Sequence, residues 1–227
     1  MKVAIIGKGN LGSHLHNALQ PTCELQWYGR EFPTTIDADI VIVSVSDDAT
    51  LQVVGDVHAP LVVHTAGAVA MANLERTGVF YPLFSFTKEA SVQWKDIPFL
   101  LECSREEDMP VLEEITRLIG ARAFHITSEQ RTKLHAAAVM VNNFTNHLYT
   151  LAKEHCQHYD LPFEVLHAIM RQGPDKAIAL GPQTAQTGPA RRGDDRTIKH
   201  HLEQIQDPAA KALYELLSEN IKKRYEL

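Results

Sequence analysis

The sequence has few cysteines, no long apolar run and no excess of basic residues, and each absence excludes a class of protein. Its three cysteines are far apart and odd in number, which excludes a disulfide framework and favours a reducing compartment. No apolar stretch reaches the roughly 18 residues that a membrane helix needs, and the apolar run at residues 3–6 is too short for a signal peptide. We therefore expect a soluble, cytoplasmic protein with no membrane contact.

The charge distribution does not suit a nucleic-acid partner. The 227 residues include 22 Lys and Arg against 28 Asp and Glu, for a formal net charge of -6. Residues 1–127 hold 9 basic and 16 acidic residues, and residues 128–227 hold 13 and 12. Neither half carries the basic stripe that a polynucleotide backbone requires, so any bound anion must be held locally.

What the first half does contain is an alternation of short apolar runs with segments of helical length. Strands are expected at residues 3–6, 25–28, 40–45, 61–64, 99–103 and 123–126, and helices at 13–20 and 109–119. Continuous apolar strands are typical of a parallel sheet that is covered on both faces. We therefore expect an α/β, Rossmann-like, mostly parallel sheet with helices on both faces over residues 1–127.

The second half is expected to be all-α. Thr127 and Gln130 form a capping-box pattern that opens a long helix. Further helices are expected at 164–171, 196–206 and 209–224, with a polar loop at 183–195 and breaks at Gly173-Pro174 and Gly181-Pro182. Residues 128–227 would then form a helical domain for substrate binding and dimerisation.

A glycine loop joins the first expected strand to the first expected helix. Its residues are Gly7-Lys8-Gly9-Asn10-Leu11-Gly12. In a dinucleotide fingerprint the first glycine permits a tight turn, the second lets the backbone approach a pyrophosphate, and the third lets the helix pack on the strand. The following helix N-terminus offers N–H groups to the phosphates. The sequence therefore predicts a dinucleotide site, as opposed to a turn with incidental glycines.

The end of the second strand indicates which dinucleotide binds. Arg30 follows this strand 23 residues after Gly7, and no Asp or Glu stands at the strand end before it, although Glu31 comes next. A carboxylate there would bind a ribose hydroxyl, whereas a cation would accept a 2′-phosphate, so the sequence favours NADP. Two alternatives stay open: Arg30 as a solvated loop cation, and a methyltransferase that uses the glycine loop for S-adenosylmethionine.

Longer stretches resemble known reductases. Residues 3–12 and 39–47 resemble the cofactor half of the superfamily of pyrroline-5-carboxylate reductase, ketopantoate reductase and 6-phosphogluconate dehydrogenase. Four further stretches resemble one subgroup, the NADP oxidoreductases with a Rossmann-like domain and a C-terminal helical domain of unknown function: 64–68, 81–86, 135–139 with 143–144, and 187–194. The resemblance covers nearly the whole chain. It implies this fold, NADP and a homodimer, with cofactor contacts at Gly7, Gly9, Asn10, Leu11, Gly12, Val45 and Ser46.

The sequence departs from these relatives at three places. Tyr81 stands where the subgroup usually has His, and Ser46 where it usually has Pro. The helical Lys-x-x-x-Asn signature of hydroxyacid dehydrogenases is missing, because Ala137 is the residue four beyond Lys133. A catalytic role for the loop at Tyr81, or for Lys133, is therefore not supported.

The expected chemistry is centred on the long helix. A nicotinamide enzyme needs a proton donor beside the reacting carbon, and His135 is the candidate because imidazole titrates near working pH. On an ideal α-helix Asn142 lies roughly 20° from His135 and Asn143 about 80° away, at 100° per residue. We expect His135 and Asn143 to be catalytic and Asn142 to bind substrate; the alternative for His135 is a structural hydrogen bond.

Other candidates lie at strand ends and in the polar loop. His64 lies at the carboxyl end of the fourth strand, where it is expected either to orient the cofactor or to stabilise a turn. Ser85 is expected either to bind substrate or to cap a turn. Arg191 and Arg192 are expected to present one guanidinium to a substrate carboxylate or phosphate, unless the loop is only a helix start capped by Asp194, Asp195 or Thr197. No metal site is expected, because the histidines lack ligand spacing.

These features predict an NADP(H)-dependent oxidoreductase that transfers hydride between nicotinamide and a small, anionic carbonyl or imine substrate. A non-catalytic NADP-binding sensor or accessory protein is the alternative from another class. It would bind the cofactor tightly, show no turnover and be indifferent to replacement of His135.

Overall fold

The computed structural model describes residues 1–226, which form two compact units, Met1–Val141 and Asn142–Leu227. We call them the sheet unit and the helical unit. The sheet unit extends beyond the boundary expected at residue 127, because helix α4 (Ser128–Ala138) is bonded to the sheet through Ser128 and Arg131. The capping box predicted at the start of α4 is present, with Thr127 and Gln130 each accepting a hydrogen bond from the other's backbone N–H.

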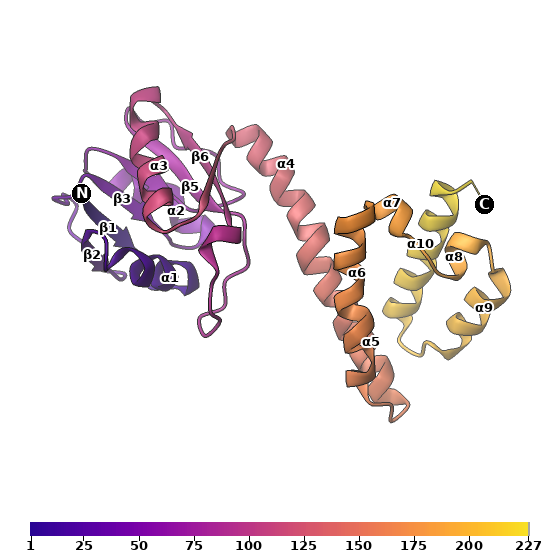
Figure 1. Ribbon diagram of the computed structural model, residues 1–227. Helices are drawn as coiled ribbons and strands as arrows, with labels where there is room; N and C mark the ends of the chain where they lie inside the picture. Colours follow the sequence, from indigo (N-terminus) through magenta and orange to yellow (C-terminus); the bar gives the residue numbers. More distant parts are fainter. Residues whose placement is uncertain (227) are drawn as a thin grey trace. The chain divides into compact units, whose positions relative to one another are not determined.

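The sheet unit is built on a seven-stranded sheet in the order β2-β1-β3-β4-β5-β6-β7 (Figure 1). The strands are β1 (Lys2–Ile6), β2 (Glu24–Tyr28), β3 (Ile40–Val43), β4 (Val62–His64), β5 (Thr77–Pro82), β6 (Pro98–Cys103) and β7 (Arg122–His125). All neighbouring pairs are parallel except β5 and β6. The expected mostly parallel α/β fold is confirmed.

The strand order places a crossover beside β1. Helix α1 (Asn10–Leu19) leads from β1 to β2 on one side, whereas β3 pairs with the other side of β1 and continues through α2 (Asp47–Asp56) to β4. In open α/β sheets, ligands bind outside the carboxyl ends of the strands at such a switch point. The loops after β1 and β3 are therefore where a ligand site is expected.

Both faces of the sheet are buried, which explains the continuous apolar strands. Val3 and Ile5 face one cluster, together with Leu15 of α1 and Leu112 of α3 (Met109–Leu118). Ala4 and Ile6 face the other cluster, which includes Val54 of α2. Alternate residues of one strand thus pack under helices on opposite faces, as strand geometry requires.

The sheet unit also contains elements that the sequence did not reveal. Strand β5 was not expected, because its run is interrupted by Gly78 and ends at Pro82. Helix α2 was not expected either, since it begins with Asp47 and Asp48 and has only two buried residues, Thr50 and Val54. Two short 3-10 turns, Trp94–Asp96 and Glu106–Asp108, complete the unit.

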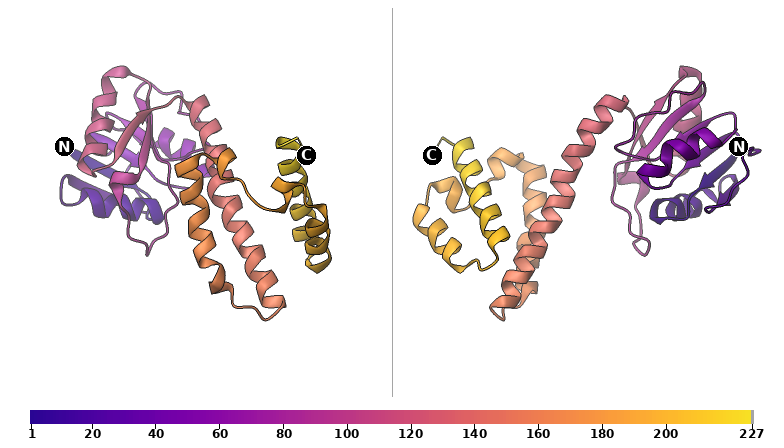
Figure 2. Two further views of the ribbon diagram at one scale, coloured as in Figure 1. Left: turned by 45° about the vertical axis from the view of Figure 1, so that its right-hand side comes forward. Right: turned by 180° about the vertical axis from the view of Figure 1, so that it is seen from behind.

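The helical unit contains α5 (Thr145–His158), a 3-10 turn (Phe163–Leu166) and α6 (His167–Leu180), which lie side by side as a hairpin (Figures 1 and 2). It continues with the short helices α7 (Pro182–Ala185) and α8 (Pro189–Arg192), then α9 (Asp195–Gln204) and α10 (Pro208–Arg224). Of the candidate N-caps for α9, Asp194 takes the role by accepting the backbone N–H of Thr197 at 3.1 Å.

Three local expectations for the second half were wrong. Gly173-Pro174 does not break the chain but lies inside α6. Residues 183–195 are not an irregular loop, because α7 and α8 form there. Val139–Phe144 is a π-helix between α4 and α5, so its side chains do not follow the 100° step used to place Asn142 and Asn143 relative to His135. None of the helices described within residues 1–226 combines the length and apolar character that crossing a bilayer requires.

Candidate functional site

Two glycines of the loop after β1 stand where no side chain fits. Gly7 has a φ of +118°, and a Cβ there would lie 1.9 Å from the carbonyl oxygen of Ser44. A Cβ at Gly12 would lie 2.2 Å from the carbonyl oxygen of Gly7. The positive φ turns the chain out of β1, and the close approach packs α1 against that turn. Local packing therefore accounts for both glycines in the way the dinucleotide fingerprint requires.

Gly9 differs from these two because the space beside it is open. A Cβ at Gly9 would meet no atom within 4 Å. Gly9 is also the N-cap residue of α1, whose first turn contains no acidic side chain and whose N-terminus receives no side-chain capping bond. Its N–H groups are available to an anion, which the helix dipole also favours. The residues present thus fit the pyrophosphate of a dinucleotide.

Cations lie at the end of β2. Arg30 is exposed there, and no ion pair of its side chain is found within residues 1–226. Lys8 extends from the glycine loop over Trp27, with Nζ 5.1 Å from the ring centroid, and Trp27 Nε1 donates to the carbonyl oxygen of Gly7 at 3.0 Å. The end of β2 thus carries positive charge from two segments and no carboxylate before Glu31.

A cavity of about 890 Å³ joins these features at the carboxyl ends of β1, β3 and β4. Its lining includes the expected residues Gly7, Gly9, Asn10, Leu11, Arg30, Val45, Ser46 and His135. Gly12 does not line it and acts through helix packing. The volume lies within the range of about 300–1,000 Å³ that is usual for small-molecule and cofactor sites.

A tyrosine and a histidine meet in this cavity. Tyr81 comes from the end of β5 and His135 from α4, and the Tyr81 hydroxyl lies 3.0 Å from His135 Nδ1. Burial, followed by the nearby Asp47 carboxylate, raises the pKa of Tyr81 above its usual value of 10.0. The Tyr81 phenol therefore keeps its proton at neutral pH, and the two side chains form a hydrogen-bonded pair that is able to transfer a proton.

His64 does not contact the cavity, contrary to expectation. Its side chain is fully buried, its Nδ1 accepts the backbone N–H of Ala66 at 3.2 Å, and its Nε2 lies 3.2 Å from the carbonyl oxygen of Ala70. Burial, followed by the charge of Arg131, lowers the pKa of His64 to about 4. His64 is therefore a neutral residue that shapes the loop after β4, and the turn role is the one it fulfils.

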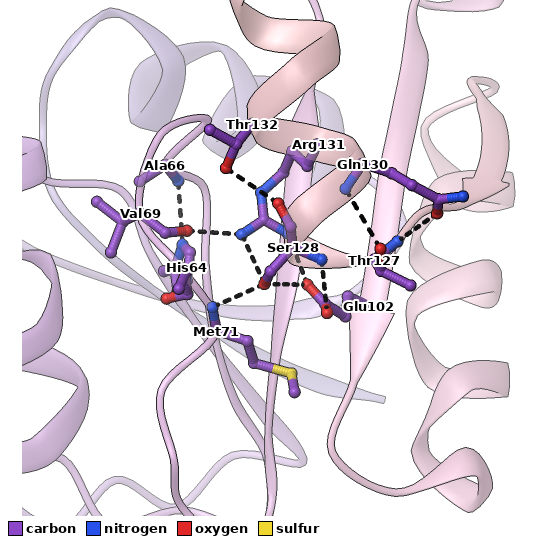
Figure 3. Close-up of polar contacts among 11 residues, drawn as sticks. His64, Ala66, Val69, Met71, Glu102, Thr127, Ser128, Gln130, Arg131 and Thr132 are labelled. Atoms are coloured by element: carbon purple, nitrogen blue, oxygen red, sulfur yellow. Dashed lines mark hydrogen bonds and ion pairs between the residues drawn. The ribbon is translucent and has the colours of Figure 1, made fainter.

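A buried ion pair fastens the same loop to α4 (Figure 3). Arg131 is completely buried, and its guanidinium donates to Glu102 Oε2 and to the carbonyl oxygen of Val69, both at 2.6 Å. Ser128 donates to Glu102 through N–H (2.8 Å) and hydroxyl (2.6 Å), and it accepts the backbone N–H of Met71 at 3.0 Å. We call Glu102, Ser128 and Arg131 the clamp. It links β6, α4 and the loop after β4.

The clamp sets the charge of Glu102 and the position of His135. Burial opposes ionisation of Glu102, but the hydrogen bonds from Ser128 and Arg131 outweigh it and hold the pKa of Glu102 below its usual value. Arg131 and His135 are four residues apart and therefore share a face of α4. The clamp thus fixes the helix turn from which His135 reaches Tyr81.

The remaining expected site residues are all exposed. Ser85 is exposed and does not line it, which removes the support for a substrate contact at that position. Asn142 and Asn143 are exposed members of the π-helix. Arg191 and Arg192 are exposed on α8 and so lie on a helical turn instead of an extended loop. The guanidinium of Arg191 stacks over the Tyr225 ring, 4.1 Å from its centroid.

Sequence reasoning overlooked Tyr81 as part of the site. Tyr81 stands where the subgroup usually has His, and the sequence pattern does not predict the strand that carries it. The available signal was an aromatic hydroxyl directly before Pro82, at the carboxyl end of a short apolar run. Within residues 1–226, no group of three or more His, Cys, Asp or Glu side chains is arranged to hold a metal ion.

Several solved structures are similar to this chain. A putative NADP oxidoreductase from Bacteroides fragilis is 36% identical, with a TM-score of 0.85 and coverage of 98% of each chain. A Thermotoga maritima protein is 21% identical, with a TM-score of 0.76 over 99% of this chain and 98% of that one. The imine reductase of Myxococcus stipitatus, solved with NADP+, shares the fold at 16% identity, with a TM-score of 0.67 over 99% and 96%.

The family follows from a match across both units. No curated protein sequence matches the chain. Residues 97–221, more than half of the chain, match the family described as a domain of unknown function, DUF2520. The match begins before β6 and runs through α4, the clamp and the helical unit into α10. The chain therefore belongs to the DUF2520 family.

Proposed function

We propose that the protein is an NADP(H)-dependent oxidoreductase that acts on a small carbonyl or imine compound. One observation carries this proposal: a single cavity is lined both by the glycine loop at the start of α1 and by the Tyr81–His135 pair. A bound nicotinamide would supply or accept the hydride, and the protein would bind, orient and exchange a proton. The name of the Bacteroides fragilis relative supports the same class of activity.

The cofactor would be held by backbone groups at one end and by charge at the other. Gly7, Gly9, Asn10 and Leu11 would bring N–H groups to the pyrophosphate, while Val45 and Ser46 would line the opening after β3. Arg30 would bind the 2′-phosphate, which gives the preference for NADP over NAD. An S-adenosylmethionine site is less well supported, because the end of β2 has no carboxylate to bind a ribose before Arg30.

The proton would come from the side of the cavity formed by α4. His135 lines the cavity beside the Thr65–Gly67 loop, and an imidazole can act as a general acid. In the reductive direction the Tyr81–His135 pair would supply a proton to the oxygen or nitrogen that gains charge as hydride arrives at carbon. Asn143 would assist, and Asn142 would orient the substrate.

The substrate is proposed to be an anion. Arg191 and Arg192 are exposed on α8, and a guanidinium bound to a carboxylate or phosphate contributes about 1.5–3 kcal/mol. Alanine at one of the two positions, the one whose guanidinium holds the substrate, should raise the Michaelis constant for an acidic substrate at least tenfold and leave its neutral ester unaffected. An unchanged preference for the acid in both variants would remove this part of the proposal.

The helical unit is proposed to form a homodimer. It exposes Ile178, Val165 and Ile169 to 84%, 67% and 64%, and large apolar side chains gathered on one small unit are typical of an interaction surface. Light scattering that gives twice the chain mass would support the dimer. A monomer at micromolar concentration would contradict it.

The proposed activity is tested by a reduction assay with NADPH on a panel of keto acids and cyclic imines. Wild type should turn over at least one substrate, and His135→Ala should lower turnover about a hundredfold without weakening NADPH binding. His125→Ala is the matched control, because His125 is an exposed histidine of the same unit, paired with Glu113. Tight NADPH binding with no turnover on any substrate would favour a sensor or accessory protein instead.

A further inference from the structure

Tyr81 lies at the edge of the sheet where the cofactor loops end. It is the last residue but one of β5, and β5 runs parallel to β4. Its side chain is half-buried and lines the same cavity as the glycine loop. A phenolic hydroxyl therefore stands at the carboxyl ends of the parallel strands, where substrates meet cofactors in this class of sheet.

The backbone of Gly67 packs directly against both side chains of the pair. A Cβ at Gly67 would lie 2.7 Å from His135 Nδ1, 2.7 Å from Tyr81 Cζ and 2.9 Å from the Tyr81 hydroxyl. Gly67 thus allows the loop after β4 to touch both side chains at once. The clamp holds this loop at Val69 and Met71, so three segments meet tightly around one hydrogen bond.

His135 directs Nδ1 at this hydroxyl. Within residues 1–226 its Nε2 has no hydrogen-bond partner, and the residue is partly exposed. A proton at Nδ1 reaches the cavity through Tyr81. We propose that the Tyr81 hydroxyl is the group that protonates the substrate and that His135 restores its proton, an inference that rests on the proposed oxidoreductase function.

In this step, every bond to hydrogen that breaks is matched by one that forms. The Tyr81 O–H bond breaks as a new O–H or N–H bond forms on the substrate, whose carbon receives the hydride and its two electrons from the nicotinamide. The Nδ1–H bond of protonated His135 then breaks and returns a proton to the Tyr81 oxygen. His135 is left neutral with its remaining proton on Nε2, and Nδ1 takes up a proton from water once the product has left the cavity. In the oxidative direction the same transfers run backwards.

The molecule contains a second Tyr–His pair that serves as an internal control. Tyr214 of α10 and His201 of α9 lie 2.7 Å apart, from hydroxyl to Nδ1, in the helical unit. Both pairs use Nδ1, and both stack edge to face, with centroids 6.0 Å apart in the first and 5.9 Å in the second. Only the first lines the cavity of the glycine loop. Tyr214→Phe therefore removes the same hydroxyl from the same kind of pair as Tyr81→Phe, but away from the cavity of the glycine loop.

The first test follows the imidazoles by nitrogen-15 NMR in the protein without cofactor. In wild type, neutral His135 should show a hydrogen-bonded Nδ1 and a protonated Nε2. Tyr81→Phe should shift the His135 resonances and leave His201 unchanged, and Tyr214→Phe should do the reverse. Identical His135 spectra in wild type and Tyr81→Phe would overturn the pair.

The second test measures single-turnover reduction with NADPH. Tyr81→Phe should lower the rate about a hundredfold with NADPH affinity unchanged, whereas Tyr214→Phe should keep the wild-type rate. If wild type reduces substrate and Tyr81→Phe keeps its rate, the Tyr81 step is wrong while the oxidoreductase function stands. If wild type reduces no substrate of the panel, the proposed function itself fails, and the relay fails with it.

Discussion

The two units of the chain bury their apolar side chains to very different degrees. In the sheet unit, strands β1 and β3 and the inward faces of α1 and α3 are almost completely excluded from solvent. In the part of the helical unit within residues 142–226, only Cys156, Ala190, Ile198 and Ser218 reach comparable burial.

This difference shows which unit buries its apolar surface by itself. A sheet covered on both faces satisfies its own apolar surface, so its site geometry can be derived from its own residues. A helical hairpin with exposed isoleucines leaves apolar surface for another surface to cover. Cofactor binding and proton transfer are therefore proposed for the sheet unit, and the dimer contact for the helical unit. The following predictions test how self-sufficient the sheet unit is.

The largest effect is expected from Arg131→Met. Removing the buried guanidinium leaves the Glu102 carboxylate without its charged partner, which typically costs about 3–5 kcal/mol of unfolding free energy. Denaturant unfolding of the sheet unit would measure it. Lys133→Met is the matched control on the same helix, because Lys133 pairs with Glu129 on the surface and should leave the unfolding midpoint where it is. Equal midpoints for both variants would show that α4 is not anchored by the clamp.

Replacing the glycines of the loop should separate stability from binding. Gly7→Ala combines a positive φ with a clash against Ser44 and should cost about 3 kcal/mol of unfolding free energy. Gly9→Ala meets open space in a conformation that alanine tolerates, so the fold should stay intact while NADPH affinity falls. Thermal unfolding and calorimetry on both variants give the two readouts. A Gly9→Ala protein that binds NADPH normally would indicate that the loop does not carry the pyrophosphate.

His64 makes the sheet unit sensitive to acid. Its pKa is about 4 in the folded protein and about 6.5 when unfolded, so the unfolded chain binds the extra proton between these values. The stabilisation is complete above pH 6.5 and is lost as the pH falls towards 4, with a total on the order of 3 kcal/mol. His64→Gln should flatten the pH dependence of the unfolding free energy in this window. A slope equal to that of wild type would show that His64 is not buried in its neutral form.

The smallest of these effects is expected at the cofactor end of the cavity. Arg30→Ala removes a charge-assisted contact of about 1.5–3 kcal/mol and should weaken NADPH binding roughly tenfold or more. NADH affinity should stay constant, because NADH has no 2′-phosphate. Calorimetry with each cofactor measures the difference. An equal loss for both cofactors would assign Arg30 to a contact that NADPH and NADH share.

Local signals in the sequence were sufficient where structure is local. The glycine loop, its helix and the Thr127 capping box involve neighbours in the chain, so spacing alone predicted them. The continuous apolar strands predicted a doubly covered sheet, because alternate residues must face opposite sides. The sequence did not predict strand β5, because Gly78 and Pro82 are unfavourable in strands. The pairing of β5 with β4 and β6 overrides that preference.

The rest of the site depends on contacts between distant segments. Tyr81 and His135 are 54 residues apart, and Arg131 reaches Val69 across 62. No periodicity in the sequence encodes such pairs. His64 was expected to orient the cofactor because it ends a parallel strand, but its ring nitrogens form hydrogen bonds with the backbone of Ala66 and Ala70. The π-helix at Val139–Phe144 likewise has no signature in the apolar pattern, so the angular placement of Asn142 and Asn143 did not hold.

The measurement that tests the central claim most directly is calorimetric titration of the wild-type protein with NADPH and with NADH. A glycine loop that binds a pyrophosphate, together with Arg30 at the end of β2, predicts one site per chain and binding of NADPH at least tenfold tighter than NADH. Equal affinity for the two would contradict the assignment of NADP. Absence of binding by either cofactor, with S-adenosylmethionine bound instead, would contradict the oxidoreductase account as a whole.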